Sequence, residues 1–444
     1  MLPALVVLAL GAFTLGTSEL GVAGLLPALG ADLAVSAGTA GTLVSVYAVA
    51  VVVAGPVGTI LLRRAPRRRV LLGALGALAV GNGATALATG LPLLLAARAF
   101  TGAAAAVYAV TALATATALV GPERRGRAVA VVFGGITASG VVGVPASTLL
   151  GDVVGWRGVY GALSALAVAV LAAAAVSLPP ASRRPLADSA SCFLRRARPA
   201  TAARSRMPYT FLGNALVTAG HYTASTYFVV LLTRRTDLAP ATAALVLLTG
   251  GVAATIGNAV GGAGADRRTR RTLLATAGSL AGCLAVVPLV MAGPVLTWLV
   301  FLVWAAAFSA FSTAAQAAVD RQAGPGAPLA GAVNISVFNV GIALGSALGG
   351  GVLHRAGFTG VHLVGAALVA VGLVTVLHGR PRDIPRTPGS GSDTEARPGP
   401  VRRHTRVRYG GSCGGPWAGL RSCVLPAINL SATLRSCSSV TIAA

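Results

Sequence analysis

The sequence contains no lysine, so all 35 of its basic Lys/Arg residues are arginine. This absence excludes a P-loop lysine, a Schiff-base lysine and a lysine acylation base. We therefore expect neither an ATP-driven pump within this chain nor an enzyme. Charged residues make up only 10% of the 444 residues, whereas hydrophobic residues make up 55%. Soluble domains carry more charge than this, and the composition predicts an integral membrane protein.

Cysteine is also scarce, with five residues in the chain. Cys192 and Cys283 are isolated, and the cysteines near the end, Cys413, Cys423 and Cys437, have spacings that match no zinc pattern. We expect no disulfide framework, no metal site and no cofactor.

Apolar stretches recur almost continuously between residues 2 and 378. A membrane-spanning helix needs about 20 such residues, so this region has room for about twelve spans. The first stretch lacks the basic region of a signal peptide and continues past Glu19 to Pro27. We interpret it as the first span of an all-α membrane protein.

The formal net charge is +24, and the arginines that cause it lie in alternate loops. They cluster at 63–69, 124–127, 183–206 and 267–271, whereas the loops near Asp32, Gly90, Asp152 and Gly293 have few. The positive-inside rule then places the arginine-rich loops and both termini in the cytoplasm, with a mild exception at Arg234 and Arg235. A nucleic-acid-binding protein would gather its charge on one folded face, so the expected partner is the lipid bilayer and not nucleic acid.

The apolar pattern stops between residues 179 and 208, where arginine, proline and serine take over. This predicts a cytoplasmic linker between two equal sets of spans, residues 1–178 and 209–378. A similar motif follows the second span of each set, at 58–68 and 262–271, which indicates a duplication. Residues 379–444 are rich in Pro, Gly, Ser and Arg, and we predict a disordered cytoplasmic tail.

Glu19 is the only acidic residue inside a predicted span, and Arg98 is the only basic residue clearly inside one. A charge at bilayer depth costs about 2.5–3.5 kcal/mol, so such residues usually face a cavity or a partner. We interpret Glu19 as a proton carrier; the alternative is a neutral carboxyl bonded to Thr17 or Ser18, or close to interfacial water. The helix directions place both residues at comparable depth, so they can pair. Alternatively, Arg98 binds backbone carbonyls and serves packing.

Polar side chains recur at three- and four-residue spacing along the seventh predicted span, which gives one polar stripe. Aromatic side chains of the tenth span can stack on an amphipathic ligand, although membrane aromatics also serve packing or the interfacial belt. The candidate cavity residues from these two spans are Asn214, Thr218, His221, Tyr222, Ser225, Trp304, Phe308 and Phe311.

The stretch with Gly262, Asp266, Arg267, Arg270 and Arg271 has a glycine, then an Asp-Arg pair, then paired basic residues. Residues 1–378 resemble the major facilitator superfamily, specifically its drug:proton antiporters with twelve spans, and this stretch looks like the gating-loop signature of that family. The first-half copy departs from it, because Leu62 and Ala65 replace the aspartate and glycine. Arg98 begins a match to the family's fourth-helix arginine motif, which is thought to assist proton movement. The fifth-span residues Gly140, Gly143 and Pro145 are similar to its antiporter motif.

Further motifs resemble arabinose-efflux-like and chloramphenicol-resistance exporters; they lie at 16–19, 24–27, 155–157 and 338–343. The last of them contains Asn339, a further candidate for the cavity. The resemblance implies two pseudo-symmetric six-helix bundles that export a small amphipathic compound in exchange for protons, by alternating access. We expect a monomer in the cell membrane. A sugar or metabolite exporter is the alternative within transport, and a non-transporting membrane sensor or scaffold is the alternative outside it.

Overall fold

A computed structural model describes residues 2–62, 65–120, 124–178, 207–236, 238–323 and 327–378. All regular elements within these ranges are helices, and all belong to one compact unit. The predicted linker, apart from its last residues, and the predicted tail lie outside the described residues.

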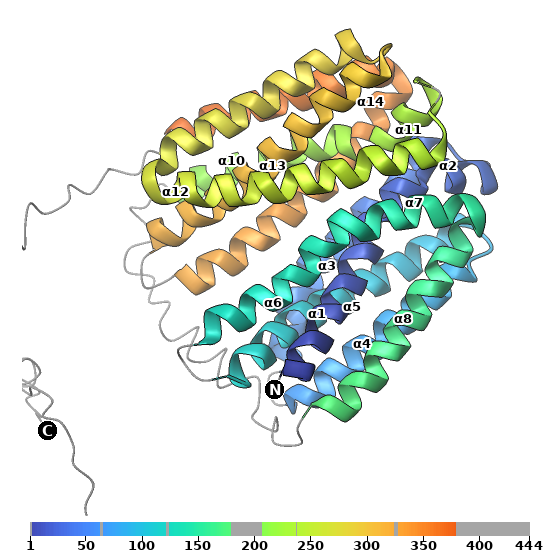
Figure 1. The fold of residues 1–444 in the computed structure, drawn as a ribbon, viewed down its shortest axis with the longest axis vertical. Coiled ribbons are helices and arrows are strands. Elements are labelled where there is room, and N and C mark those ends of the chain that lie inside the picture. The colour runs from blue at the N-terminus through green and yellow to red at the C-terminus, as the bar shows by residue number, and fades with distance from the viewer. Residues whose placement is uncertain are drawn as a thin grey trace, which may run out of the picture. The chain divides into compact units, whose positions relative to one another are not determined.

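The first half begins with an interrupted span and continues with long helices (Figure 1). Ser36 starts the second span by accepting a hydrogen bond of 3.0 Å from the Thr39 backbone amide. Gly155 allows the tight turn before the last helix because its φ of 70° favours glycine. The elements are α1 (Leu2–Leu20), α2 (Val22–Asp32), α3 (Ala37–Leu61), α4 (Arg67–Ala86), α5 (Leu91–Ala118), α6 (Arg125–Ala138), the π-helical turn η2 (Ser139–Gly143), α7 (Val144–Val153) and α8 (Gly155–Ser177).

The second half consists of α10 (Met207–Ser225), α11 (Phe228–Arg234), α12 (Pro240–Val290), α13 (Pro294–Ala323) and α14 (Ala327–His378). Two of these are pairs of helices joined at a break. Arg268 breaks α12 with φ −150° and ψ 70°, and Gly357 breaks α14 with φ 62° and ψ −165°.

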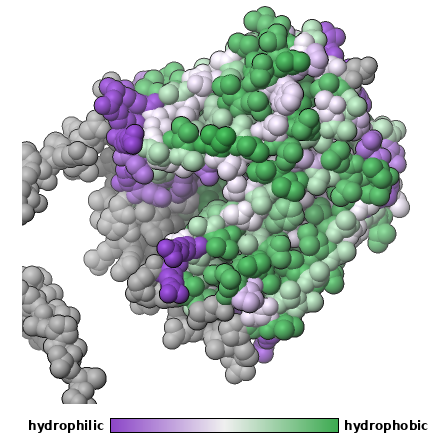
Figure 2. Space-filling model, in the orientation of Figure 1, coloured by the Kyte–Doolittle hydropathy of each residue, from purple (hydrophilic) through white to green (hydrophobic). Residues whose placement is uncertain are grey.

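Ten helical segments of the described chain are long and apolar enough to cross a membrane. Two of the ten, α12 and the greater part of α14, are each broken into two helices, so there are twelve crossing segments. The prediction of about twelve spans is confirmed. Figure 2 shows hydrophobic side chains over most of the visible face and hydrophilic ones mainly at its ends, as a bilayer requires.

Each half has its own apolar core. One core is built from α1, α3, α4, α5, α6 and α8 around Leu8, Leu75 and Tyr108. The other is built from α10 to α14 around Leu280 and Trp304. The halves therefore pack internally as two separate helix bundles.

The two bundles meet through reciprocal helix pairs, because α3 packs on α14 while α12 packs on η2 and α7. The close approaches lie toward the end that carries Asp32, where α2, α7 and α11 are found (Figure 1). There Gly38 and Gly350 bring the backbones of α3 and α14 together: a Cβ on Gly38 would lie 2.7 Å from the Gly350 carbonyl oxygen. Leu26, Ala40 and the buried Tyr227 complete an apolar seal between the halves.

Candidate functional site

A cavity of about 480 Å³ lies between the two bundles. Its walls come from α1, α2, α3, α6, η2 and α7 on one side and from α10 to α14 on the other. It begins behind the seal and extends along α12 and α13 toward the end that carries the arginine-rich loops. Asn258, Ser309 and Thr313 line this extension. The cavity is thus closed near Asp32 and reaches toward the opposite end.

Glu19 lies one residue before the end of α1, where Gly21 separates α1 from α2. Among the described residues that line the cavity it is the only acidic one, and none of them is an arginine. The neighbouring hydroxyls do not bind its carboxyl. Ser18 Oγ donates to Asn82 Oδ1 at 2.7 Å, and Thr17 Oγ1 is buried without a partner among the described residues. Glu19 therefore presents the one ionisable carboxyl to this space.

Arg98 lies fully buried on α5, outside the set of lining residues. Its Nη1 donates to the Ser18 carbonyl at 2.8 Å, and its guanidinium carbon lies 4.4 Å from the centre of the Tyr47 ring. Two ion pairs are found among the described residues, and neither joins Arg98 to Glu19. Arg98 thus binds the backbone next to Glu19 in this conformation.

Tyr47 is a site residue that sequence reasoning missed. It lines the cavity together with Glu19 and also stacks on Arg98. Within the part of the chain that the structure describes, its hydroxyl is buried without a hydrogen-bond partner, and so are the Nε and Nη2 atoms of Arg98. No sequence motif marks this tyrosine, because its role depends on the packing of α3 against α5.

An aromatic group on α10 and α13 forms the opposite wall. The His221 ring stacks on Phe308 with 3.5 Å between centroids and parallel planes, and the Tyr222 ring contacts both edge-on. Trp304 lies buried behind them and donates from Nε1 to His221 Nδ1 at 2.9 Å. Of the predicted cavity residues, His221, Tyr222, Ser225 and Phe308 line this cavity.

The other predicted cavity residues lie outside its lining. Thr218 and Phe311 are fully buried within the second bundle. Asn339 donates to the Ile335 carbonyl of its own helix at 3.0 Å. Asn214 donates to Asn334 Oδ1 at 2.9 Å, so it connects α10 to α14. These side chains, like the buried Trp304, contact protein in this conformation.

The predicted gating loop lies at the break in α12. Its charged side chains are exposed there: Asp266, Arg267, Arg270 and Arg271. Gly262, which precedes them, is partly buried, and none of the five residues lines the cavity. Arg321 at the end of α13 lies 3.9 Å from Asp266 and donates to the Ala265 carbonyl at 2.9 Å. Arg321 is a further partner that the sequence pattern did not reveal.

The residues of the antiporter-like motif occupy η2 and the start of α7. Gly140 lines the cavity, and Gly143 packs so closely on Thr17 that a Cβ would collide with that side chain. Pro145 is the second residue of α7, directly after the π-helical turn, and it has no backbone N–H to donate to that preceding turn. The motif therefore brings the fifth span against the segment of α1 that carries Glu19.

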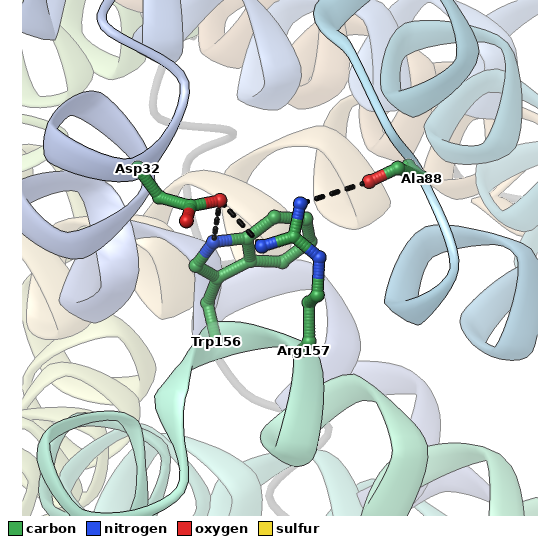
Figure 3. Close-up of polar contacts among 4 residues, drawn as sticks. All are labelled: Asp32, Ala88, Trp156 and Arg157. Carbon is green, nitrogen blue, oxygen red and sulfur yellow. Dashed lines mark hydrogen bonds and ion pairs between the residues drawn. The ribbon is translucent and has the colours of Figure 1, made fainter.

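A polar cluster holds the first bundle together at the closed end (Figure 3). Arg157 forms an ion pair with Asp32 and donates to the Ala88 carbonyl at 3.1 Å, while Trp156 Nε1 donates to Asp32 at 3.1 Å. The hydrogen bond from Arg157 lowers the pKa of Asp32. Partial loss of hydration raises this pKa, and the hydrogen bond from Trp156 lowers it further. The cluster ties together the ends of α2, α4 and α8.

Residues 8–328 match the Major Facilitator Superfamily. The chain is 32% identical over 377 residues to the inner membrane transport protein YdhP of Escherichia coli, covering 84% of this chain and 94% of that protein. It is 35% identical over 376 residues to a chloramphenicol resistance protein of Streptomyces lividans, with coverage of 83% and 94%. Among solved structures, the D-xylose-proton symporter has a TM-score of 0.70 at 14% identity, with coverage of 86% and 98%.

These matches confirm the predicted fold, an all-α membrane protein with about twelve helices in two six-helix bundles. The chain is a multi-pass membrane transporter, and it belongs to the major facilitator superfamily.

Proposed function

We propose that this protein exports a small amphipathic compound in exchange for protons. The observation that carries the proposal is the position of Glu19, the one carboxyl that lines the cavity between the bundles. A carboxyl in such a place can hold a proton in one conformation and release it in another. Arg98, which binds the carbonyl of the preceding residue Ser18, supplies a fixed positive charge near this carboxyl.

The chemistry of the cavity wall supports an amphipathic substrate. Near Glu19 the wall is mainly apolar and aromatic, with Tyr47, Tyr222 and Phe308 available for stacking. The relative from Streptomyces lividans is a chloramphenicol resistance protein. A phenicol-like compound, which combines a flat ring with a few polar groups, fits these observations.

The direction of opening supports alternating access. The cavity reaches toward the arginine-rich loops, and the positive-inside rule places those loops and both termini in the cytoplasm. This conformation then takes up substrate from the cytoplasm, and the seal at Gly38 and Gly350 must open to release it.

Transport by the purified protein in proteoliposomes tests the proposal. With an acidic lumen, outward proton flow should drive accumulation of labelled chloramphenicol, and a protonophore should abolish it. Equal accumulation of chloramphenicol with and without the pH gradient would contradict proton exchange.

A sugar or metabolite exporter is the second candidate, and one feature favours it. Hydrogen-bonding side chains gather where the cavity approaches the arginine-rich end: Asn258, Ser309, Ser312 and Thr313. A susceptibility panel in an efflux-deficient host, with phenicols, cationic dyes and sugar analogues, separates the two. Protection against phenicols alone supports the first candidate, and protection against sugar analogues alone supports the second.

A further inference from the structure

His221 occupies an unusual position, because three aromatic rings contact its imidazole. Phe308 stacks on the imidazole plane, and Tyr222 and Trp304 approach edge-on at 5.0 and 5.7 Å between centroids. The ring therefore has little freedom to rotate, and the directions of its two nitrogens are fixed.

The contact with Trp304 also fixes where the imidazole carries its proton. An indole N–H only donates, so the Nδ1 atom that accepts from it at 2.9 Å must present a lone pair. The neutral ring then carries its proton on Nε2. A second proton on Nδ1 would point at the Trp304 N–H and remove this bond, so the position favours the neutral ring.

The Nε2 atom is open toward the cavity. It has no hydrogen-bond partner among the described residues. It is also not one of their fully buried polar atoms, so a solute can reach it. His221 itself lines the cavity. One N–H donor of fixed direction is therefore available to a solute beside the Phe308 ring.

We infer that His221 is a specificity-determining residue, which selects planar aromatic solutes that carry a hydrogen-bond acceptor on the ring. The solute lies in the cavity beside the aromatic group, and its acceptor takes the Nε2–H proton as a hydrogen bond. Trp304 is a positioning residue, because it holds the donor on Nε2. This inference rests on the proposed transport of amphipathic compounds and names their chemical class.

Equilibrium binding to the purified full chain tests the inference, with three labelled probes that differ at one ring position. Chloramphenicol carries a nitro group there, a second probe carries a methylsulfonyl group, and a third carries a methyl group that accepts no hydrogen bond. The wild type should bind the two acceptor probes about tenfold more tightly than the methyl probe, as one ordinary hydrogen bond provides.

The variants separate the donor from the aromatic shape. His221→Phe keeps a ring on Phe308 but has no donor, so it should bind all three probes equally. His221→Gln keeps an N–H and should retain part of the preference. Trp304→Phe frees the tautomer and should reduce the preference several-fold. His362 also contacts Trp304, with 6.0 Å between centroids, but lies outside the cavity lining, so His362→Asn should keep the full preference.

Equal binding of the three probes by the wild type, or no binding of any probe, overturns the inference. A full preference in His221→Phe overturns it as well. If that variant does not fold, an unchanged preference in Trp304→Phe overturns it instead. The binding assay uses no proton gradient, so it fails or succeeds independently of the transport assay. Absence of proton-driven flux would contradict the proposed function but not the binding preference of the wild type. Equal binding of the three probes would contradict this inference but not proton-driven export.

Discussion

The guanidinium of Arg98 donates a 2.8 Å hydrogen bond to the backbone carbonyl of Ser18, the residue before Glu19. A buried cation at membrane depth needs a countercharge, a carbonyl or water, and here a carbonyl and the Tyr47 ring serve. The contact holds α5 against the part of α1 that carries the cavity carboxyl. Arg98 is thus connected to Glu19 through the backbone of the preceding residue.

Replacing Arg98 should affect stability and export together. Arg98→Ala loses a hydrogen bond from a charged group, worth about 1.5–3 kcal/mol, and should lower export at least about tenfold. Arg98→Lys keeps the charge but loses the planar fork, so its defect should be smaller. Thermal unfolding in detergent and flux in proteoliposomes measure both effects. Arg124→Ala, at an exposed position, is the control; an Arg98→Ala protein that matches it would show that the contact is dispensable.

Glu19→Gln should abolish proton-driven export while leaving the protein folded and able to bind substrate. The amide keeps the shape of the side chain but cannot titrate. Flux driven by a pH gradient is compared with equilibrium binding of the same labelled compound. Asp152→Asn removes an exposed acid at the end of α7 and should transport normally. Full gradient-driven flux through Glu19→Gln would mean that protons use another group.

The seal at the closed end predicts an asymmetric response to two adjacent glycines. A Cβ on Gly350 would lie 2.8 Å from Tyr227 Oη and 2.9 Å from the Gly38 carbonyl oxygen, whereas one on Gly351 would have nothing within 4 Å. Overpacking costs about 1–3 kcal/mol, so Gly350→Val should disfavour the conformation that is closed at this end. Gly351→Val should have little effect.

The response can be measured at Asn258, which lines the part of the cavity that extends toward the arginine-rich end. A cysteine placed there, in a protein without its native cysteines, reports access by its rate of maleimide labelling. Gly350→Val should slow labelling from the arginine-rich side about tenfold or more. Equal rates in the two valine variants would refute this account of the seal.

The Asp32–Arg157 pair predicts a dependence of stability on pH. Because Arg157 lowers the pKa of Asp32 in the folded protein, the pair stabilises the fold above the ordinary pKa of an aspartate. This contribution is lost as the pH falls through the lowered pKa. The melting temperatures of the wild type and Asp32→Asn should differ slightly at neutral pH and converge in acid. High salt should reduce the difference, since the pair is exposed; a difference that grows in acid would contradict the assignment.

The class of the protein and the positions of its spans follow from the amino-acid sequence alone. Length and apolarity decide which segments enter a bilayer, and these are local properties. The isolated charges Glu19 and Arg98 were equally visible, because any charge at membrane depth is conspicuous in an apolar sequence. The break at Arg268 was visible as well, since it falls within the predicted loop at 262–271 between two spans of the sequence.

Which polar side chains face the cavity depends on how the helices pack against one another. Asn214, Thr218, His221 and Ser225 share one helical stripe in the sequence, yet only His221 and Ser225 line the cavity, whereas Asn214 binds Asn334. A helix has one polar face whether it meets a cavity or a neighbouring helix, so periodicity cannot distinguish the two. The same holds for Tyr47 on Arg98 and for Trp304 on His221, because these contacts join residues of different helices and depend on how the helices pack.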